Sequence, residues 1–207
     1  HHPLFVQIEL KYPMQADATS TDLDHIDEAI RAVFSEDVLV TPAMVQGSAA
    51  TLRDALATNG WPTLGESRGH TLFYLDCDRD LCLRYTDGNG SIATRAMFPD
   101  SVPADDFAAV MVANSPDAAA MALVQQGFIV RVFADSAADV LAGTNDLDAA
   151  LDSGAQILSS DVPVPRTDGP TYYAQIPGGT PSRCNPVTAA TACVPSDIET
   201  PSLLQGR

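Results

Sequence analysis

Lysine is almost missing from this sequence: Lys11 is the only one, and the 27 acidic residues give a formal net charge of −16. A surface that binds nucleic acid needs clustered basic side chains to neutralise phosphates. We therefore predict no nucleic-acid partner. An anionic lipid surface would also repel this chain unless cations lie between the two.

Long hydrophobic runs and common hydrolase motifs are missing as well. The longest apolar runs, such as residues 107–113, are far shorter than the ~20 residues that span a bilayer. No GxSxG motif is present and no cysteine has a plausible histidine partner, which disfavours serine and cysteine hydrolases. His25 falls on the polar side of an expected helix and His70 precedes an expected strand, so neither is a good candidate for a catalytic base.

The four cysteines form two close pairs, Cys77 with Cys82 and Cys184 with Cys193. Neither pair has the CxxC spacing of zinc sites or thioredoxin-like redox sites. Disulfides that close short loops are the preferred interpretation, and four unpaired thiols are the alternative. Disulfides indicate an oxidising compartment, so we expect a secreted or periplasmic protein.

Short apolar runs alternate with helical patterns along the chain. The runs are near-continuous, as in strands that are buried on both faces of a parallel sheet. Helical spacing covers residues 22–34, 51–59, 117–126 and 146–153. This alternation predicts right-handed βαβ units. The five expected strands are Leu4–Ile8, Thr71–Leu75, Ala109–Ala113, Phe128–Val132 and Gln156–Ser159.

Five strands do not close a barrel, and no Gly-rich turn follows the first strand to favour a dinucleotide fold. We therefore predict an α/β fold that is the C-terminal part of a (β/α)8 barrel. After Asp161 the chain becomes rich in proline and glycine. The predicted domains are a barrel portion, residues 1–165, and an irregular C-terminal extension, residues 166–207, that packs on it and is stapled by Cys184–Cys193.

A polar residue ends each expected strand: Glu9, Asp76, Asn114, Arg131 and Asp161. In a barrel these ends meet on one face. Carboxylate and amide oxygens suit Ca²⁺ or Mg²⁺, and a guanidinium suits phosphate. The alternative is that these residues are ordinary loop residues and helix caps.

Two local patterns near these strand ends have more than one interpretation. Glu9 and Lys11 lie two apart and face the same side, so they form either a metal–phosphate site or an ordinary ion pair. The acidic run 76–80, with Asp87 further on, imitates a calcium loop but has Leu81 where that loop needs glycine. We favour a solvated acidic loop held by Cys77–Cys82.

Several segments resemble the bacterial calcium-dependent phosphoinositide phospholipase C family, whose catalytic domain is a TIM barrel. The resemblance covers nearly the whole chain in order, and its tail is the most specific part. The segments are 3–11, 51–56 with 60–65, 68–76, 127–131 with 134–135, 148–156 with 160–161, and 176–179, 183–186 and Cys193.

The resemblance implies that the first expected strand is the family's fourth, so the chain would supply about strands four to eight. Glu9 would then be a Ca²⁺ ligand, and Asp76 is the second expected metal ligand. In such enzymes two histidines and further acidic ligands come from the first three strands, which are not in this chain. The family's reaction is attack of the inositol 2-hydroxyl on phosphorus to give a cyclic phosphate, with calcium stabilising the charge.

The resemblance also implies a substrate pocket. Arg131 is the candidate for contacting the phosphate or the inositol head group, and Tyr172 or Tyr173 would line the sugar pocket. Lys11 and Asp161 are further expected substrate contacts. The substrate would be a phospholipid head group or a soluble phosphodiester, with peripheral membrane contact allowed; the sequence does not predict the oligomeric state.

Two departures from the family pattern leave a second hypothesis open. Ala43, Met44 and Gln46 stand where a family loop usually carries acidic residues and an arginine, and Phe133 replaces an expected second basic residue. The first hypothesis is a Ca²⁺-dependent phosphoric diester hydrolase that acts on phosphatidylinositol or a related phosphodiester. The alternative is a non-catalytic secreted binding protein on the same barrel. Either way, we expect residues 1–207 alone to be inactive and poorly soluble or oligomeric.

Overall fold

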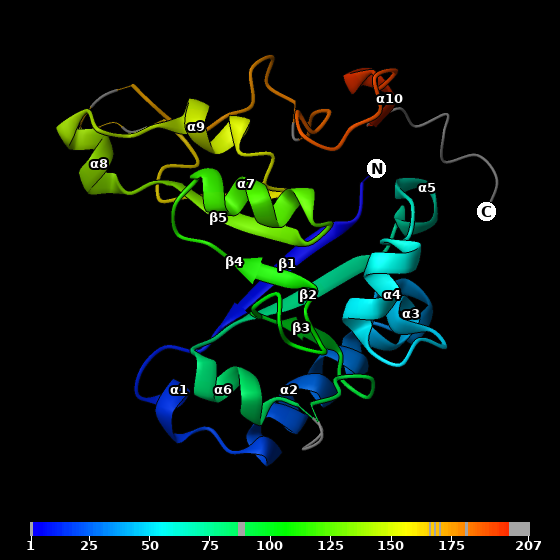
Figure 1. The fold of residues 1–207 in the computed structure, drawn as a ribbon. Helices are drawn as coiled ribbons and strands as arrows, with labels where there is room; N and C mark the ends of the chain where they lie inside the picture. Colours follow the sequence, from blue (N-terminus) through cyan, green and yellow to red (C-terminus); the bar gives the residue numbers. More distant parts are fainter. Residues whose placement is uncertain are drawn as a thin grey trace. The chain divides into compact units, whose positions relative to one another are not determined.

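The computed structural model describes residues 2–86, 90–165, 167, 169, 171–180 and 182–198 (Figure 1). Its strands and helices fall into two compact units, and the chain passes from the first to the second between Met111 and Val112. The separation of a barrel portion from a tail at residue 165 stays a prediction.

The first unit contains a parallel sheet in the order β1-β2-β3. In the register of β1 against β2, Leu4 lies opposite Thr71 and Glu9 lies opposite Asp76. The third strand continues the same register, with Tyr74 opposite Phe98. The strands are β1 (Leu4–Glu9), β2 (Thr71–Asp76) and β3 (Met97–Pro99).

Side-chain caps fix where the helices of this unit begin. Thr19 and Asp22 form a capping box at the start of α2, and Thr51 accepts from the backbone N–H of Asp54 at the start of α4. These two helices confirm the helical patterns expected from the sequence. The helices are α1 (Met14–Asp17), α2 (Ser20–Val33), the 3₁₀ turn η1 (Glu36–Val38), α3 (Pro42–Gln46), α4 (Leu52–Asn59), α5 (Leu64–Ser67) and α6 (Arg79–Arg84).

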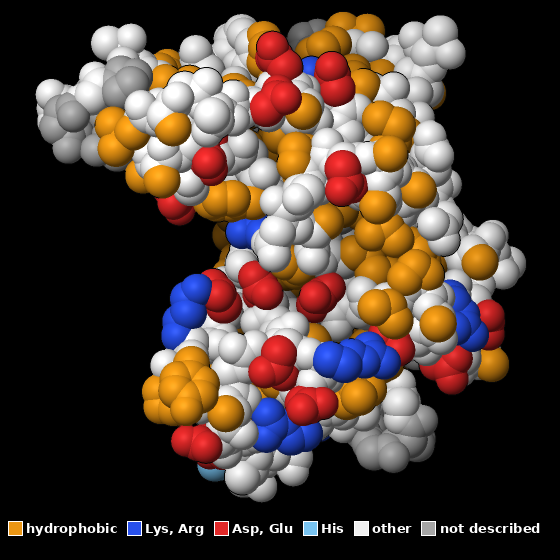
Figure 2. All heavy atoms as spheres, turned by 60° about the vertical axis from the view of Figure 1, so that its left-hand side comes forward, with side chains coloured by type: hydrophobic (Ala, Val, Ile, Leu, Met, Phe, Trp, Pro, Cys, Tyr) orange, Lys and Arg blue, Asp and Glu red, His pale blue; other side chains and the backbone are white. Residues whose placement is uncertain are grey.

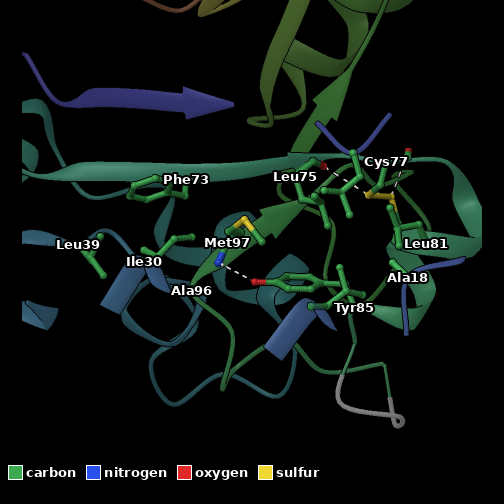
Figure 3. Packing of buried hydrophobic residues seen from close by; sticks show 13 residues of the cluster. Ala18, Ile30, Leu39, Phe73, Leu75, Cys77, Leu81, Tyr85, Ala96 and Met97 are labelled. Atoms are coloured by element: carbon green, nitrogen blue, oxygen red, sulfur yellow. Dashed lines mark hydrogen bonds between the residues drawn. A yellow bond between two sulfur atoms is a disulfide. The ribbon is translucent and has the colours of Figure 1, made fainter. Parts of the chain in front are cut away.

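One face of this sheet belongs to the hydrophobic core. Phe73, Leu75 and Met97 are buried there, with Leu23 and Ile30 of α2 in the same cluster. Figure 3 shows Phe73 and Leu75 on β2 above Met97 and Tyr85, with the Cys77 disulfide at one end of the cluster. Because side chains alternate along a strand, the residues between these core residues point to the other face.

A buried polar network lies inside this core. The Tyr85 hydroxyl donates to Asp27 Oδ1 over 2.5 Å and accepts from the backbone N–H of Met97 over 2.9 Å. Arg95 pairs with Asp24 and contacts Asp27 Oδ2 at 3.5 Å, and its guanidinium lies 4.8 Å from the centre of the Tyr85 ring. The buried carboxylate is thus paired with both the hydroxyl and the guanidinium, which is how charge is kept in a core.

The second unit is built around β5, the central strand of a sheet in the order β4-β5-β6, and β4 includes the point where the chain passes into this unit. Helices α7 and α9 pack on β5 (Figure 1). The β5 and β6 strands are parallel, with an irregular register between Phe133 and Asp135. The strands are β4 (Val110–Val112), β5 (Ile129–Asp135) and β6 (Ile157–Ser160), and the helices are α7 (Ala118–Gln125), α8 (Ala137–Ala142), α9 (Leu147–Asp152) and α10 (Pro195–Ile198).

The C-terminal tail is attached to the turn between α9 and β6. Cys184 and Cys193 are joined in a disulfide, and Arg183 donates to the carbonyl of Leu151. Asn185 Nδ2 donates to the carbonyl of Gly154 over 2.6 Å. The stapled loop therefore docks on this turn through side-chain to backbone hydrogen bonds.

The structure corrects three details of the sequence interpretation. It has six strands among the described residues, because Met97–Pro99 is a further strand, so the strands do not map one to one on barrel positions four to eight. The strands β2, β3, β4 and β5 are buried along most of their length, whereas β1 and β6 are half-exposed. Arg131 is the third residue of β5 and not its end.

Both predicted disulfides are present, Cys77–Cys82 in the first unit and Cys184–Cys193 in the second. The described helices include none with the length and apolar character needed to cross a bilayer.

The Tyr85 network predicts a large stability difference between two tyrosine variants. Tyr85→Phe leaves the Met97 N–H and the Asp27 carboxylate without their buried partner, so we expect the unfolding free energy to fall by ~1–3 kcal/mol. Tyr12→Phe, at an exposed tyrosine, should change it by less than about 0.5 kcal/mol. Urea unfolding measures both, and equal losses would contradict the role given to the network.

The tail contact predicts a difference between two glycines with positive φ. A Cβ on Gly154 would lie 2.5 Å from Val187 Cγ2 and 3.0 Å from Asn185 Oδ1, whereas a Cβ on Gly127 would meet nothing within 4 Å. Both alanine variants carry backbone strain, but only Gly154→Ala should also loosen the tail, at an additional ~1–3 kcal/mol. Limited proteolysis should cut residues 171–193 faster in Gly154→Ala than in Gly127→Ala; equal rates would show that the tail is held elsewhere.

Candidate functional site

Two carboxylates lie side by side at the C-terminal end of the first sheet. Glu9 and Asp76 are opposite each other in the parallel register, so their side chains point to the same face. This is the face away from the Phe73 and Leu75 core. The strand-end acids expected to bind metal are thus brought together on neighbouring strands.

A hydrogen-bonded chain leads to one of these acids from the interior. The Tyr74 hydroxyl, on a side chain that is only 2% exposed, donates to Gln7 Oε1 over 2.8 Å. Gln7 Nε2 in turn donates to Asp76 Oδ2 over 2.7 Å. Gln7 has no counterpart among the residues singled out from the sequence, because a lone glutamine inside a strand carries no motif.

Lys11 forms an ion pair with Glu9 just beyond the end of β1. Its side chain is 78% exposed and that of Glu9 39%. The ammonium shows that the Glu9 carboxylate accepts a cation at this place. The structure thus contains the ion pair, and any contact of Lys11 with substrate stays a prediction.

Acidic side chains are spread widely over the surface. Figure 2 shows them across the face drawn there, with basic side chains beside several of them. This mixture gives no continuous basic stripe on that face, in agreement with the net charge of −16. A cationic ligand is therefore easier to attract here than an anionic one.

A third acid ends the strand that the sequence interpretation missed. Asp100 follows β3, and its backbone N–H donates to the carbonyl of Leu75 over 2.9 Å, which places Asp100 beside Asp76 in the sheet. The signal was an apolar triplet followed by an acid, the same pattern as Leu75 with Asp76. Within the described ranges, however, no group of three or more His, Cys, Asp or Glu side chains is arranged to hold a metal ion.

The acidic run after β2 forms the start of helix α6. Asp78 accepts from the backbone N–H of Leu81 over 2.9 Å and caps α6. Arg79 pairs with Asp105 through two contacts of 2.6 Å. Asp87, the last acid of the proposed calcium pattern, lies outside the described residues.

In the second unit, Arg131 places a positive charge in a buried position. Its side chain is 9% exposed, and Nη1 donates to Asn114 Oδ1 over 3.1 Å. The guanidinium lies 5.4 Å from the centre of the Phe133 ring, so the residue that replaces an expected basic side chain stacks on this one. Nε is buried without a hydrogen-bond partner, and no carboxylate among the described residues pairs with the guanidinium.

Asp135, the true end of β5, is a buried acid that the sequence interpretation did not single out. It is 2% exposed and accepts from Ser160 Oγ over 2.6 Å and from the Tyr172 hydroxyl. Burial, together with Asp135, raises the pKa of Tyr172 to about 12, so the phenol stays protonated and donates at neutral pH. Ser136 and Asp139, which form a capping box after this strand, were the available signal.

The other predicted contacts are dispersed. Asp161 follows β6 directly, is exposed, and accepts from the backbone N–H of Ala137 over 3.3 Å. Tyr173 donates to Gln175 Oε1 over 2.6 Å. Tyr172 is engaged with Asp135, so a role for any of the three in substrate binding stays a prediction.

No described histidine lies at the C-terminal end of a strand. His25 is exposed on α2, and His2 and His70 precede β1 and β2. His1 lies outside the described residues. The residues that depart from the family loop, Ala43 and Met44 with Gln46, form the short helix α3.

A family model described as phosphoinositide phospholipase C, Ca²⁺-dependent, matches residues 1–186. Among solved structures, a Ca²⁺-dependent phosphatidylinositol-specific phospholipase C from Streptomyces antibioticus is similar with a TM-score of 0.52 and 18% identity, over 78% of this chain and 64% of that one. A calcium-dependent phosphoinositol-specific phospholipase C from a Gram-negative bacterium, Pseudomonas sp, is similar with a TM-score of 0.54 and 17% identity, over 78% of this chain and 59% of that one.

At these identities the two structures establish a similar α/β fold with parallel strands. This chain spans less than two thirds of the length of each. None of the curated proteins matches it.

The contrast between two buried arginines predicts stability changes of opposite sign. Arg131 pairs with no carboxylate in the described part of the chain, so Arg131→Met should remove an uncompensated desolvation cost and raise the unfolding free energy by ~1 kcal/mol or more. Arg95 pairs with two aspartates, and one of them, Asp27, is buried. Arg95→Met should leave the Asp27 carboxylate without this cationic partner and lower the unfolding free energy by ~3–5 kcal/mol. Urea unfolding of both variants measures the signs; a large loss for Arg131→Met would mean that a carboxylate does neutralise it.

Proposed function

This chain belongs to the Ca²⁺-dependent phosphoinositide phospholipase C family, and on that premise we propose that it is part of a calcium-dependent phosphoric diester hydrolase. The proposed substrate is phosphatidylinositol or a related phosphodiester, cleaved through a cyclic inositol phosphate. The observation that carries the proposal is the pair of carboxylates, Glu9 and Asp76, at the ends of adjacent parallel strands.

These carboxylates fit calcium by the chemistry of their donor atoms. Ca²⁺ takes six to eight oxygen ligands, and carboxylates are its usual protein donors. Glu9 already holds a cation in the form of the Lys11 ammonium. Two side chains supply only part of a coordination shell, so further oxygens would come from water, from substrate and from residues outside this pair. A calcium ion here would stabilise negative charge that develops on the phosphoryl oxygens.

Arg131 is the proposed contact for the phosphate or head group. A guanidinium offers planar donors that match phosphate oxygens. Asn114 holds one of its nitrogens and Phe133 stacks on it, so the side chain is oriented without being neutralised. A buried arginine with an unsatisfied Nε and no carboxylate partner in the described part of the chain suits an anionic ligand.

Proton transfer is the function that this chain's described residues do not supply. The attack of a hydroxyl on phosphorus needs a general base, and expulsion of the leaving group needs a general acid. None of His2, His25 and His70 lies at the C-terminal end of a strand. We therefore propose that the catalytic histidines are supplied from outside residues 1–207 and that these residues alone do not turn over substrate.

The two disulfides support an extracytoplasmic location, because such bonds persist in oxidising compartments. The acidic surface and the lipid substrate together favour transient, calcium-assisted membrane contact.

A non-catalytic binding protein remains a second candidate function, and one observation favours it. Lys11 forms an ion pair with Glu9, and this ammonium would compete with calcium for the Glu9 carboxylate. A scaffold that keeps this ion pair could bind inositol phosphates through Arg131 without hydrolysing them.

Substitution of Glu9 separates the two functions. In a protein that includes the preceding segment, Glu9→Gln should lower calcium-dependent release of cyclic inositol phosphate by at least about 100-fold, because metal stabilisation contributes several kcal/mol. Glu28→Gln, which removes an exposed acid of α2, is the matched control and should keep full activity.

Three outcomes would change this conclusion. Calcium-dependent turnover that survives Glu9→Gln would remove Glu9 from the metal site. Binding of inositol phosphate without turnover in the longer protein would favour the binding protein. Strong activity of residues 1–207 alone would show that the catalytic bases have been misplaced.

A further inference from the structure

Gln7 joins two residues of β2 from its place on β1. Its amide accepts from Tyr74 and donates to Asp76, at 2.8 and 2.7 Å. Tyr74 is the residue opposite Gln7 in the register, and Asp76 is opposite Glu9. All four side chains therefore share the face away from the core, and the amide spans the two strands diagonally.

The direction of these hydrogen bonds is fixed by chemistry. An ionised carboxylate only accepts, so the Gln7 group that faces Asp76 must be the NH₂. The carbonyl oxygen must then face Tyr74, which has to donate its proton. Both bonds therefore point the same way, toward the negative charge of Asp76, and each polarises the next.

This chain restricts how the Asp76 carboxylate can rotate. Tyr74 is 2% exposed and cannot move away without leaving a buried hydroxyl unsatisfied. Gln7 is held at both ends of its amide. The Oδ2 atom of Asp76 is thereby tethered to the Gln7 amide, which limits the rotation of the carboxylate.

We propose that Gln7, held by Tyr74, is a positioning residue that orients Asp76 for calcium binding at the strand ends. This inference rests on the proposed calcium site at Glu9 and Asp76. Outer hydrogen bonds of this kind fix ligand orientation in metal sites and typically contribute 10–100-fold in metal affinity. Neither Gln7 nor Tyr74 is proposed to touch the metal.

The test is direct calcium titration by calorimetry of the same longer protein that is used for the Glu9 test. Gln7→Met keeps the length of the side chain but removes both hydrogen bonds, and should weaken calcium binding by about 10-fold or more. Tyr74→Phe removes only the hydroxyl and should weaken it by about 3- to 10-fold. Because both act through one chain, Tyr74→Phe should have no further effect in the Gln7→Met background.

Tyr85→Phe is the matched control. It makes the same change at another buried tyrosine, which lies in the core on the opposite face of the sheet and donates directly to Asp27. It should lower the unfolding free energy in EDTA while leaving calcium affinity unchanged. A purely structural role of Tyr74 would give the same result as this control.

The outcomes distinguish the inference from the function on which it rests. If calcium binding depends on Glu9 but not on Gln7 or Tyr74, the positioning role is wrong and the calcium site stands. If the two single variants weaken binding additively, Tyr74 does not act through Gln7 and the chain as proposed is wrong. If the longer wild-type protein shows no calcium binding that Glu9→Gln removes, both are overturned.

Discussion

The register of β1 against β2 is the constraint on which the first unit depends. With Glu9 opposite Asp76, Val6 and Ile8 of β1 and Phe73 and Leu75 of β2 face the core, and Gln7, Tyr74 and both acids reach the other face. A slip of one residue would send the acids into the core and the phenylalanine out of it. The burial of Phe73 and Leu75 therefore selects the same register that assembles the two carboxylates, so packing energy positions the polar site.

The two units treat buried charge in opposite ways. In the first, Asp27 pairs with Arg95 and accepts from Tyr85, so the charges make the core specific. In the second, Arg131 is oriented by Asn114 and Phe133 but pairs with no carboxylate of the described residues. A neutralised arginine cannot attract an anion, whereas an oriented and uncompensated one can. Stability and ligand binding thus place different demands on the same side chain.

The sequence predicted what local patterns encode. Helical spacing located α4 and α9, and cysteine spacing located both disulfides. It missed β3 because Met97–Pro99 is too short for a periodic signal and ends in proline. It also missed Asp135 and Gln7, since their roles arise from pairing with residues distant in sequence, Tyr172 and Asp76. The sequence was sufficient to predict which residues lie near the end of a strand. It was not sufficient to predict which side chains become partners across strands.

The strand-end carboxylates also bear on how folding and metal binding are linked. Two unit charges about 4 Å apart repel by ~1 kcal/mol in water and ~4 kcal/mol near a protein surface. Lys11 and Gln7 offset part of this repulsion, one by charge and one by hydrogen bonding. A divalent cation at the proposed site would offset more, and it would favour the folded register over an unfolded chain in which the acids are far apart. If the proposed site binds calcium, calcium should therefore stabilise the sheet by mass action. The register that brings the two acids together would then serve both the packing of the sheet and the attraction of a cation.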